Sequence, residues 1–200
     1  MFPEHIETES LELRQLSEAS VDVFELYELF SDSRGDVTEV FEHVPQEPYA
    51  TVNETRERLQ KAQSAWDDGD AAQYAIVTAD EELAGFTGLF LEWERKSARI
   101  GFILGKPYWG NGYAGECAMA LTDLAFDRLD LELVAIGHEA GNERSNRAIE
   151  KFIEEVGGQY DGVLRNWTPL GETIADHHRY TVSREEYERA IEDDTHSDSL

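Results

Sequence analysis

Helical and strand-like spacings of apolar residues alternate along the chain, without an internal repeat or a linker rich in Gly, Ser or Pro. An apolar residue every three or four positions indicates a helix, and one every second position indicates a half-buried strand. The predicted helices cover Val21–Phe30, Asn53–Trp66 with Asn53 as its cap, Gly110–Arg128, Ser145–Val156 and Arg184–Ile191. The predicted strands cover Ile6–Leu16, Gln73–Thr78, Leu83–Trp93, Ala98–Leu104, Leu131–Ile136, Tyr160–Arg165 and His177–Val182. This order indicates an α+β or layered α/β domain around one mixed sheet.

One domain is expected to account for most of the chain. Its 200 residues, 40% of them hydrophobic, suffice for one core, and we expect a single domain over residues 4–191 and an acidic, disordered tail over 192–200. Asp32–Tyr49 contains a glycine and two prolines and is predicted to be an irregular loop. No apolar run approaches the roughly 18 residues that cross a bilayer, and the N-terminus lacks a signal peptide. We therefore expect a soluble cytoplasmic protein without a membrane partner.

The charge is strongly acidic. Forty-three Asp and Glu residues against 17 Lys and Arg leave a net charge of −26, and only four of the bases are lysines. Nucleic acid is disfavoured as a partner because phosphate binding needs a basic face. An acidic surface poor in lysine suits a salt-rich cytoplasm, where self-repulsion is screened, and such a surface would also attract cationic partners.

The segment from Ile100 to Glu116 carries the clearest chemical signal. A predicted strand ends there, and a helix begins at a turn that contains Gly110 and Gly112. Free backbone amides at a helix start, together with the helix dipole, favour an anion, and glycines let a phosphate approach closely. The same Gly-x-Gly pattern also occurs where a helix start only needs the turn geometry.

The sequence Trp-Gly-Asn-Gly-Tyr-Ala-Gly-Glu over residues 109–116 resembles the coenzyme A signature of the GNAT superfamily of N-acetyltransferases. It has the Gly-x-Gly-Tyr-Ala-x-Glu form of the Rim-type branch, the ribosomal-protein N-terminal acetyltransferases. Residues 6–14, 142–151 and 162–165 resemble that branch's opening strand, its Asn-x-x-Ser helix start with a later Glu-Lys, and its following strand. The resemblance covers most of the chain and implies the GNAT fold, a mixed, splayed sheet flanked by helices.

The resemblance also implies acetyl-CoA as co-substrate and no metal. In the family, the strand that ends at Leu104 pairs with the pantetheine arm, and the glycine turn holds the pyrophosphate. The splay between that strand and Leu133–Ile136 forms the cleft for the thioester. The positions implied to bind acetyl-CoA are Phe102, Ile103, Leu104, Trp109, Gly110, Asn111, Gly112, Tyr113, Ala114 and Asn142. Because Pro107 and Trp109 stand where the family often has Gln or Arg, phosphate neutralisation would depend on amides with Lys106 and Arg147 nearby.

The expected reaction is direct attack of an amine on the thioester, which needs a proton acceptor and a donor for the departing thiolate. The resemblance places Ser145 near the sulfur as general acid. Asn142 and Ser145 are also strong helix caps, so either could satisfy helix amides instead. Thr168 occupies the position where the branch carries a glutamate base. Glu139 is our candidate for the base.

His138, His177 or a chain of waters could also take the proton. Adjacent strand residues point to opposite faces, so His177 and His178 are not expected to chelate one metal ion. Cys117 lies inside a predicted helix and is expected to be a packed core residue rather than a nucleophile.

The expected acceptor is a primary amine, with a protein N-terminus favoured and a small-molecule amine as the alternative. A non-catalytic acyl-CoA-binding module is the rival from another class, and a homodimer is an assembly that the sequence allows. The first two helices and Asn166–Asp176 would wall the acceptor site. The acidic residues there that would suit a cationic acceptor are Glu25, Glu28, Glu39, Glu42 and Glu172.

Overall fold

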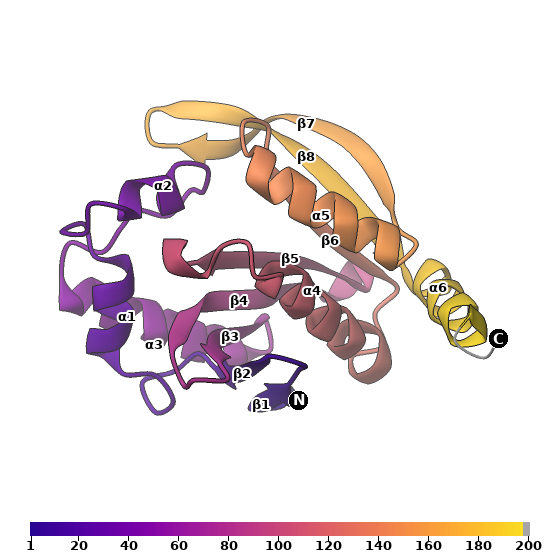
Figure 1. Ribbon diagram of the computed structural model, residues 1–200, viewed down its shortest axis with the longest axis horizontal. Coiled ribbons are helices and arrows are strands. Elements are labelled where there is room, and N and C mark those ends of the chain that lie inside the picture. The colour runs from indigo at the N-terminus through magenta and orange to yellow at the C-terminus, as the bar shows by residue number, and fades with distance from the viewer. Residues whose placement is uncertain (198–200) are drawn as a thin grey trace.

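The computed structural model describes residues 1–197, and its centre is an eight-stranded mixed sheet with helices on both faces (Figure 1). The strands are β1 (His5–Glu7), β2 (Leu11–Gln15), β3 (Ala71–Thr78), β4 (Leu83–Glu92), β5 (Ser97–Leu104), β6 (Leu133–Glu139), β7 (Gln159–Leu170) and β8 (Thr173–Ser183). The helices are α1 (Val23–Phe30), α2 (Val37–Phe41), α3 (Val52–Asp68), α4 (Tyr113–Asp123), α5 (Glu143–Glu155) and α6 (Arg184–Ser197). The expected α+β architecture is confirmed.

The strands follow the order β1-β2-β3-β4-β5-β6-β8-β7 across the sheet. Every neighbouring pair is antiparallel except β5 and β6, which run parallel. A parallel pair needs a long crossover, and α4 with the π-helical turn Leu124–Arg128 supplies it. The start of α4 therefore lies beside the end of β5.

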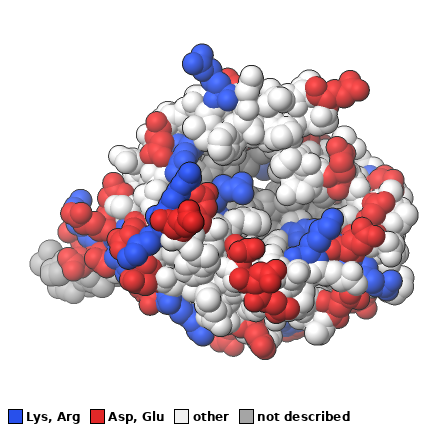
Figure 2. Space-filling model, turned by 180° about the vertical axis from the view of Figure 1, so that it is seen from behind, with Lys and Arg blue, Asp and Glu red and all other residues white. Residues whose placement is uncertain are grey.

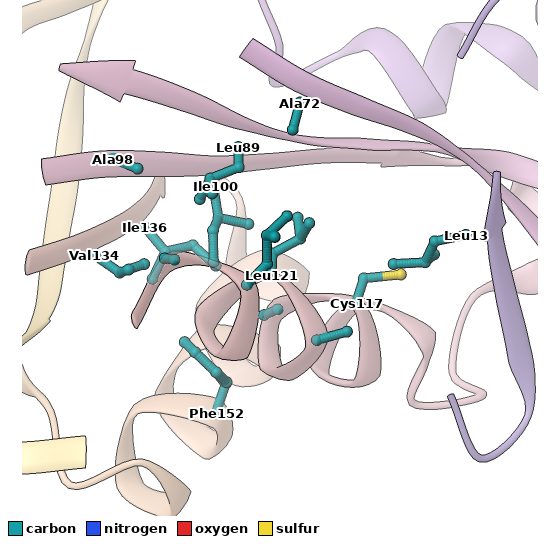
Figure 3. Close-up of a cluster of buried hydrophobic side chains, with 14 of the residues drawn as sticks. Leu13, Ala72, Leu89, Ala98, Ile100, Cys117, Leu121, Val134, Ile136 and Phe152 are labelled. Atoms are coloured by element: carbon teal, nitrogen blue, oxygen red, sulfur yellow. The ribbon is translucent and has the colours of Figure 1, made fainter. Parts of the chain in front are cut away.

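Two hydrophobic clusters fix the helices to the sheet. Under α4 and α5, Leu121 and Cys117 point from α4 towards strand residues that include Leu13 and Ile100 (Figure 3). Under α1 and α3, the second cluster includes Leu26, Phe30, Leu59, Phe86 and Ile103. Cys117 is fully buried, and burial raises the pKa of its thiol. This agrees with a packing role for the residue.

The predicted strand Ile6–Leu16 is wrong as one element, because the chain turns between β1 and β2. The Glu116 carboxylate on α4 holds that turn: it accepts from the Ser10 amide at 2.7 Å and from the Thr8 hydroxyl. These hydrogen bonds outweigh the effect of burial and lower the pKa of Glu116. The contact joins residues more than a hundred positions apart, so local spacing does not reveal it.

Two predictions around α3 need correction. The region 32–49, predicted to be a loop, contains the five-residue helix α2. Helix α3 is capped by Thr51 and not by Asn53, since the Thr51 hydroxyl accepts from the Glu54 amide at 3.3 Å. The Glu54 carboxylate in turn accepts from the Ala50 amide at 2.9 Å, which resembles a capping box shifted by one residue.

The C-terminal elements are longer than predicted. The final two strands form a hairpin that continues to Leu170 and restarts at Thr173, beyond the predicted Tyr160–Arg165 and His177–Val182. Helix α6 passes its predicted end at Ile191 and reaches Ser197. Part of the predicted tail 192–200 is therefore helical, and residues 198–200 lie outside the described residues. The domain boundary at residue 191 stays a prediction.

Candidate active site

Strands β5 and β6 separate part-way along their length. Their parallel pairing ends at Arg99 and Ala135, although β5 runs on to Leu104 and β6 to Glu139. Beyond this point, among the strands of residues 1–197, β5 pairs only with β4, and β6 pairs only with β8. The expected splay is therefore present, and within the same residues one edge of the last part of β5 has no strand neighbour.

A cavity of about 1240 Å³ opens beside this splay. Its walls come from the end of β5, the start of α4, one side of α5 and residues 39–44 in and after α2. The expected residues that line the cavity are Phe102, Ile103, Leu104, Trp109, Gly110, Gly112, Tyr113, Ala114, Asn142 and Ser145. Two expected residues are not brought to its walls: Asn111 donates its side-chain amide to the Tyr108 carbonyl at 3.3 Å, and Glu139 lies behind His43.

The glycine turn is built to leave space. Gly110 and Gly112 have φ angles of 82° and 86°, a left-handed conformation that residues with a side chain rarely adopt. A Cβ on either residue would meet no other atom within 4 Å, so the space beside both is open. Gly112 is the cap of α4 and provides no side chain to accept from the first helix amides. These amides can therefore bind an anion.

Helix α5 brings cations to the same cavity. Arg144 and Lys151 both line the cavity, about two turns apart on one side of the helix. The Arg144 guanidinium stacks 3.6 Å above the centre of the Trp109 ring. Of the two expected cations, Lys106 pairs with Glu39 and does not line the cavity, whereas Arg147 lines it and lies 3.9 Å from the exposed Glu143 carboxylate. Arg144 and Lys151 were not expected, although their helical spacing could have indicated a shared face.

Asn142 takes the capping role at the start of α5. Its Oδ1 accepts from the Ser145 backbone amide at 3.0 Å. The cap of α5 is the Asn142 side chain, and Ser145 is one of the residues that line the cavity. Of the two residues that could cap the helix, Asn142 therefore does so, and Ser145 remains available at the cavity.

Glu139 forms a pair with a histidine that sequence reasoning missed. His43, which follows α2, places its Nδ1 2.8 Å from the Glu139 carboxylate. The Glu139 side chain is 11% exposed, while His43 is 25% exposed and lines the cavity. A carboxylate that holds one ring nitrogen of a histidine fixes the ring orientation, so the other nitrogen can transfer a proton. In His43 this other nitrogen, Nε2, lies 3.8 Å from the exposed Glu42 carboxylate. The Glu139–His43 pair is therefore a candidate base.

The two other histidine candidates lie elsewhere. His138 is buried, with its Nε2 3.0 Å from Asn146 Oδ1 and its ring stacked 5.0 Å from His178. His177 lies on the opposite face of β8, where its Nδ1 is 3.0 Å from the Thr168 hydroxyl. Burial, with smaller contributions from neighbouring positive groups, lowers the pKa of His177 to about 4. A histidine with that pKa is a weak base at neutral pH.

Replacing His177 by glutamine should reduce the loss of stability on mild acidification. The unfolded histidine titrates near 6.5 and the folded one near 4, so acid favours the unfolded chain throughout that interval. Stability contributed by neutral His177 is present above pH 6.5 and is lost as the pH falls towards 4. Urea unfolding at pH 7 and pH 5 measures the difference. Equal losses in the variant and the parent would contradict the assignment.

Across residues 1–197, no three His, Cys, Asp or Glu side chains gather closely enough to hold a metal ion. The adjacent His177 and His178 point to opposite faces of β8, as expected from strand geometry. Within the described part of the chain, no helix is both long and apolar enough to span a bilayer.

Comparison with known proteins gives a consistent result. The family profile of the acetyltransferase (GNAT) domain matches residues 10–152. Among curated proteins, the uncharacterised N-acetyltransferase p20 of Bacillus licheniformis is 27% identical over 186 residues, covering 92% of this chain and 98% of the relative.

Solved structures have the same fold. RimL, a ribosomal L7/L12 α-N-protein acetyltransferase solved with coenzyme A, has a TM-score of 0.76 at 23% identity and covers 90% of this chain and 98% of its own. The microcin C7 self-immunity acetyltransferase MccE, solved with acetyl-CoA and AMP, has a TM-score of 0.79 at 17% identity, covering 91% of this chain and 97% of its own.

Proposed function

The chain belongs to the GNAT acetyltransferase family, and from this premise we propose that it moves the acetyl group of acetyl-CoA onto a primary amine. The observation that carries the proposal is that the unpaired edge of β5 and the glycine turn before α4 line one cavity. An extended thioester arm and an anionic pyrophosphate need those two features together. The coenzyme A and acetyl-CoA named with RimL and MccE give further support.

The residues in the cavity wall suit distinct parts of acetyl-CoA. Backbone groups of Phe102–Leu104 would pair with the pantetheine arm along the free edge of β5. The amides around Gly110 and Gly112 would hold the pyrophosphate, with Arg144 and Lys151 supplying the positive charge that the turn itself lacks. A free amide on β5 would stabilise the oxyanion as the amine attacks.

His43 and Glu139 are proposed to take the proton from the amine. The amine nitrogen bonds to the thioester carbon and loses a proton to the pair as the tetrahedral intermediate forms. The carbon–sulfur bond then breaks, and the departing thiolate receives a proton from Ser145. Ser145 would recover its proton from solvent or from the His43–Glu139 pair, so that each turnover consumes one thioester and one amine.

Changing Ser145 to alanine should lower kcat about tenfold or more, because the thiolate would then leave unprotonated. The binding of acetyl-CoA should be preserved, since the Asn142 cap uses the Ser145 backbone amide, which alanine retains. Steady-state rates over a pH series measure the effect. A kcat unchanged at every pH would remove Ser145 from the mechanism.

Two kinds of acceptor amine are compatible with this reaction, and one of them is preferred. A protein N-terminus is preferred on the Rim-type signature at residues 109–116 and on the likeness to RimL. A small-molecule amine is the alternative. The acidic, lysine-poor composition supports work in a salt-rich cytoplasm, and nucleic acid is not proposed as a partner. A homodimer remains a prediction from the sequence alone.

Release of free thiol from acetyl-CoA, followed over a panel of peptide N-termini and small amines, tests the proposed function. Thiol release that depends on an amine, with the acetylated product identified by mass spectrometry, is the expected result. Binding of acetyl-CoA without turnover on any member of the panel would favour a non-catalytic acyl-CoA-binding module instead.

A further inference from the structure

Two glycines on neighbouring strands lie opposite each other near the centre of the sheet. Gly88 of β4 pairs directly with Gly101 of β5 on one side and with Gln73 of β3 on the other. Directly paired residues share a face, and here that face is the one covered by α3. A Cβ on Gly88 would lie 3.0 Å from Gln73 Cγ, and a Cβ on Gly101 would lie 3.3 Å from Phe90 Cε2. Gln73 and Phe90 therefore lie across the two glycines.

An arginine lies beside each of these two side chains. Arg58 of α3 donates to Gln73 Oε1 at 2.6 Å and lies 4.7 Å from the centre of the Phe86 ring. Arg99 of β5 lies 5.3 Å from the centre of the Phe90 ring. The two cations thus approach the Gly88–Gly101 pair from different elements. Figure 2 shows the side of the molecule turned away from the viewer in Figure 1, which is hollowed near its centre and carries basic side chains among the acidic ones around the hollow.

Neither guanidinium has a carboxylate partner among the described residues, although acids outnumber bases by 43 to 17. Most other arginines do find one, including Arg14, Arg34 and Arg184. Arg58 is also partly buried, and burial lowers its pKa despite a nearby Tyr49. A desolvated cation without a counter-charge is costly, so Arg58 suits an anion that arrives from outside the chain. Arg99 is exposed, and no carboxylate of the described residues competes with that anion for its guanidinium.

Arg99 lies at the start of the splay that leads towards the proposed base. Arg99 stands where β5 and β6 stop pairing, opposite Ala135. Glu139 is four residues further along β6, about 13 Å at strand spacing, and shares the Ala135 face because their separation is even. That distance joins backbone positions, and the side chains of Arg99 and Glu139 both approach closely enough to His177 to act on its charge. A small molecule held by Arg99 can therefore extend along the splay to His43 and Glu139.

We infer that the acceptor amine carries a carboxylate a few bonds from its amino group, and that Arg58 and Arg99 bind this carboxylate. The inference rests on the proposed function and gives its acceptor a chemical class. Arginine suits this role because its planar fork matches the two oxygens of a carboxylate. The carboxylate could belong to an acidic residue near a peptide N-terminus or to a free amino acid. This is the reverse of the cationic acceptor expected from Glu25, Glu28, Glu39, Glu42 and Glu172.

Matched acceptors test the inference by binding, independently of turnover. Calorimetry with CoA-saturated protein would compare the peptide amides Ser-Glu-Ala and Ser-Gln-Ala, and in a second arm γ-aminobutyrate with its amide. The acidic member of at least one pair should bind about tenfold or more tightly. The arm that shows the preference identifies the source of the carboxylate.

Variants of the two arginines provide the second half of the test. Arg58→Gln and Arg99→Gln should each remove the preference and leave binding of the amide member unchanged. Arg56→Gln is the matched control, because Arg56 lies on the same helix, pairs with Glu18 at 3.3 Å and is exposed. Equal binding of both members, or a preference that survives both arginine variants, would overturn the inference.

Turnover separates this inference from the proposed function. Acetylation without a preference for the acidic member would leave the proposed function standing and overturn the inference. A binding preference without acetylation would support the inference and count against the proposed function. If no member of either pair binds, the inference is overturned whatever the turnover on other amines.

Discussion

Replacing Gly110 and Gly112 together by valine should abolish the binding of acetyl-CoA while the protein stays folded. A Cβ on either glycine would meet no other atom within 4 Å, so the valine side chains would extend into the open space that a phosphate needs. Both residues are left-handed, and valine there costs about 1–2 kcal/mol per position in backbone strain or shifts the turn itself. Either effect removes the amides from their anion-binding geometry. A loss of affinity of about a hundredfold or more is expected.

Thermal unfolding with and without acetyl-CoA measures this loss, since a ligand that binds only the folded state raises Tm. Gly171→Val is the matched control. Gly171 is also left-handed, with a φ of 56° and open space beside it, but it lies at the β7–β8 turn away from the cavity. The control should lose some stability and keep the full Tm rise. A full Tm rise in the double variant would show that the turn does not hold the pyrophosphate.

Changing His43 to glutamine or Glu139 to glutamine should lower kcat about a hundredfold with little change in acetyl-CoA affinity. The two side chains meet at 2.8 Å, and the pair would carry the amine proton. Removal of a positioned general base costs about 10²- to 10⁴-fold in rate. Because the two groups act together, the double variant should be hardly slower than the slower single variant.

The chain provides a matched control for this pair. His5 and Glu12 meet at the same distance of 2.8 Å, on strands β1 and β2 and outside the cavity wall. His5→Gln and Glu12→Gln should leave kcat unchanged. Stopped-flow or steady-state thiol release measures the parent and all five variants. A kcat close to the parent value in both His43→Gln and Glu139→Gln would remove the pair from the mechanism. Solvent would then be the acceptor of the amine proton.

Local sequence signals were sufficient for the parts of the site that are locally built. The turn at Gly110 and Gly112 needs residues that adopt left-handed conformations, and those residues mark it in the sequence. Helix α4 begins directly afterwards, as its apolar spacing predicts. The splay of β5 and β6 was expected from the family resemblance and not from periodicity, because each strand alone has an ordinary pattern of buried residues.

Long-range contacts explain what the sequence did not reveal. The Glu139–His43 contact joins residues 96 positions apart, and His43 lay in a segment with no regular spacing. The break between β1 and β2 depends in the same way on Glu116. The placement of Arg58 and Arg99 around the Gly88–Gly101 pair depends on the register of β3, β4 and β5, which sequence patterns do not fix. Arg144 and Lys151 differ, because helical spacing alone could have placed them together.

The central claim is that the cavity between the glycine turn and the splayed strands binds acetyl-CoA. Calorimetric titration of the purified protein with acetyl-CoA in molar KCl, with adenosine diphosphate as the control ligand, tests it most directly. Saturable binding of one acetyl-CoA per chain, much tighter than that of adenosine diphosphate, is the expected result. No binding of acetyl-CoA to folded protein would overturn the claim, and the glycine turn would then be only the start of a helix.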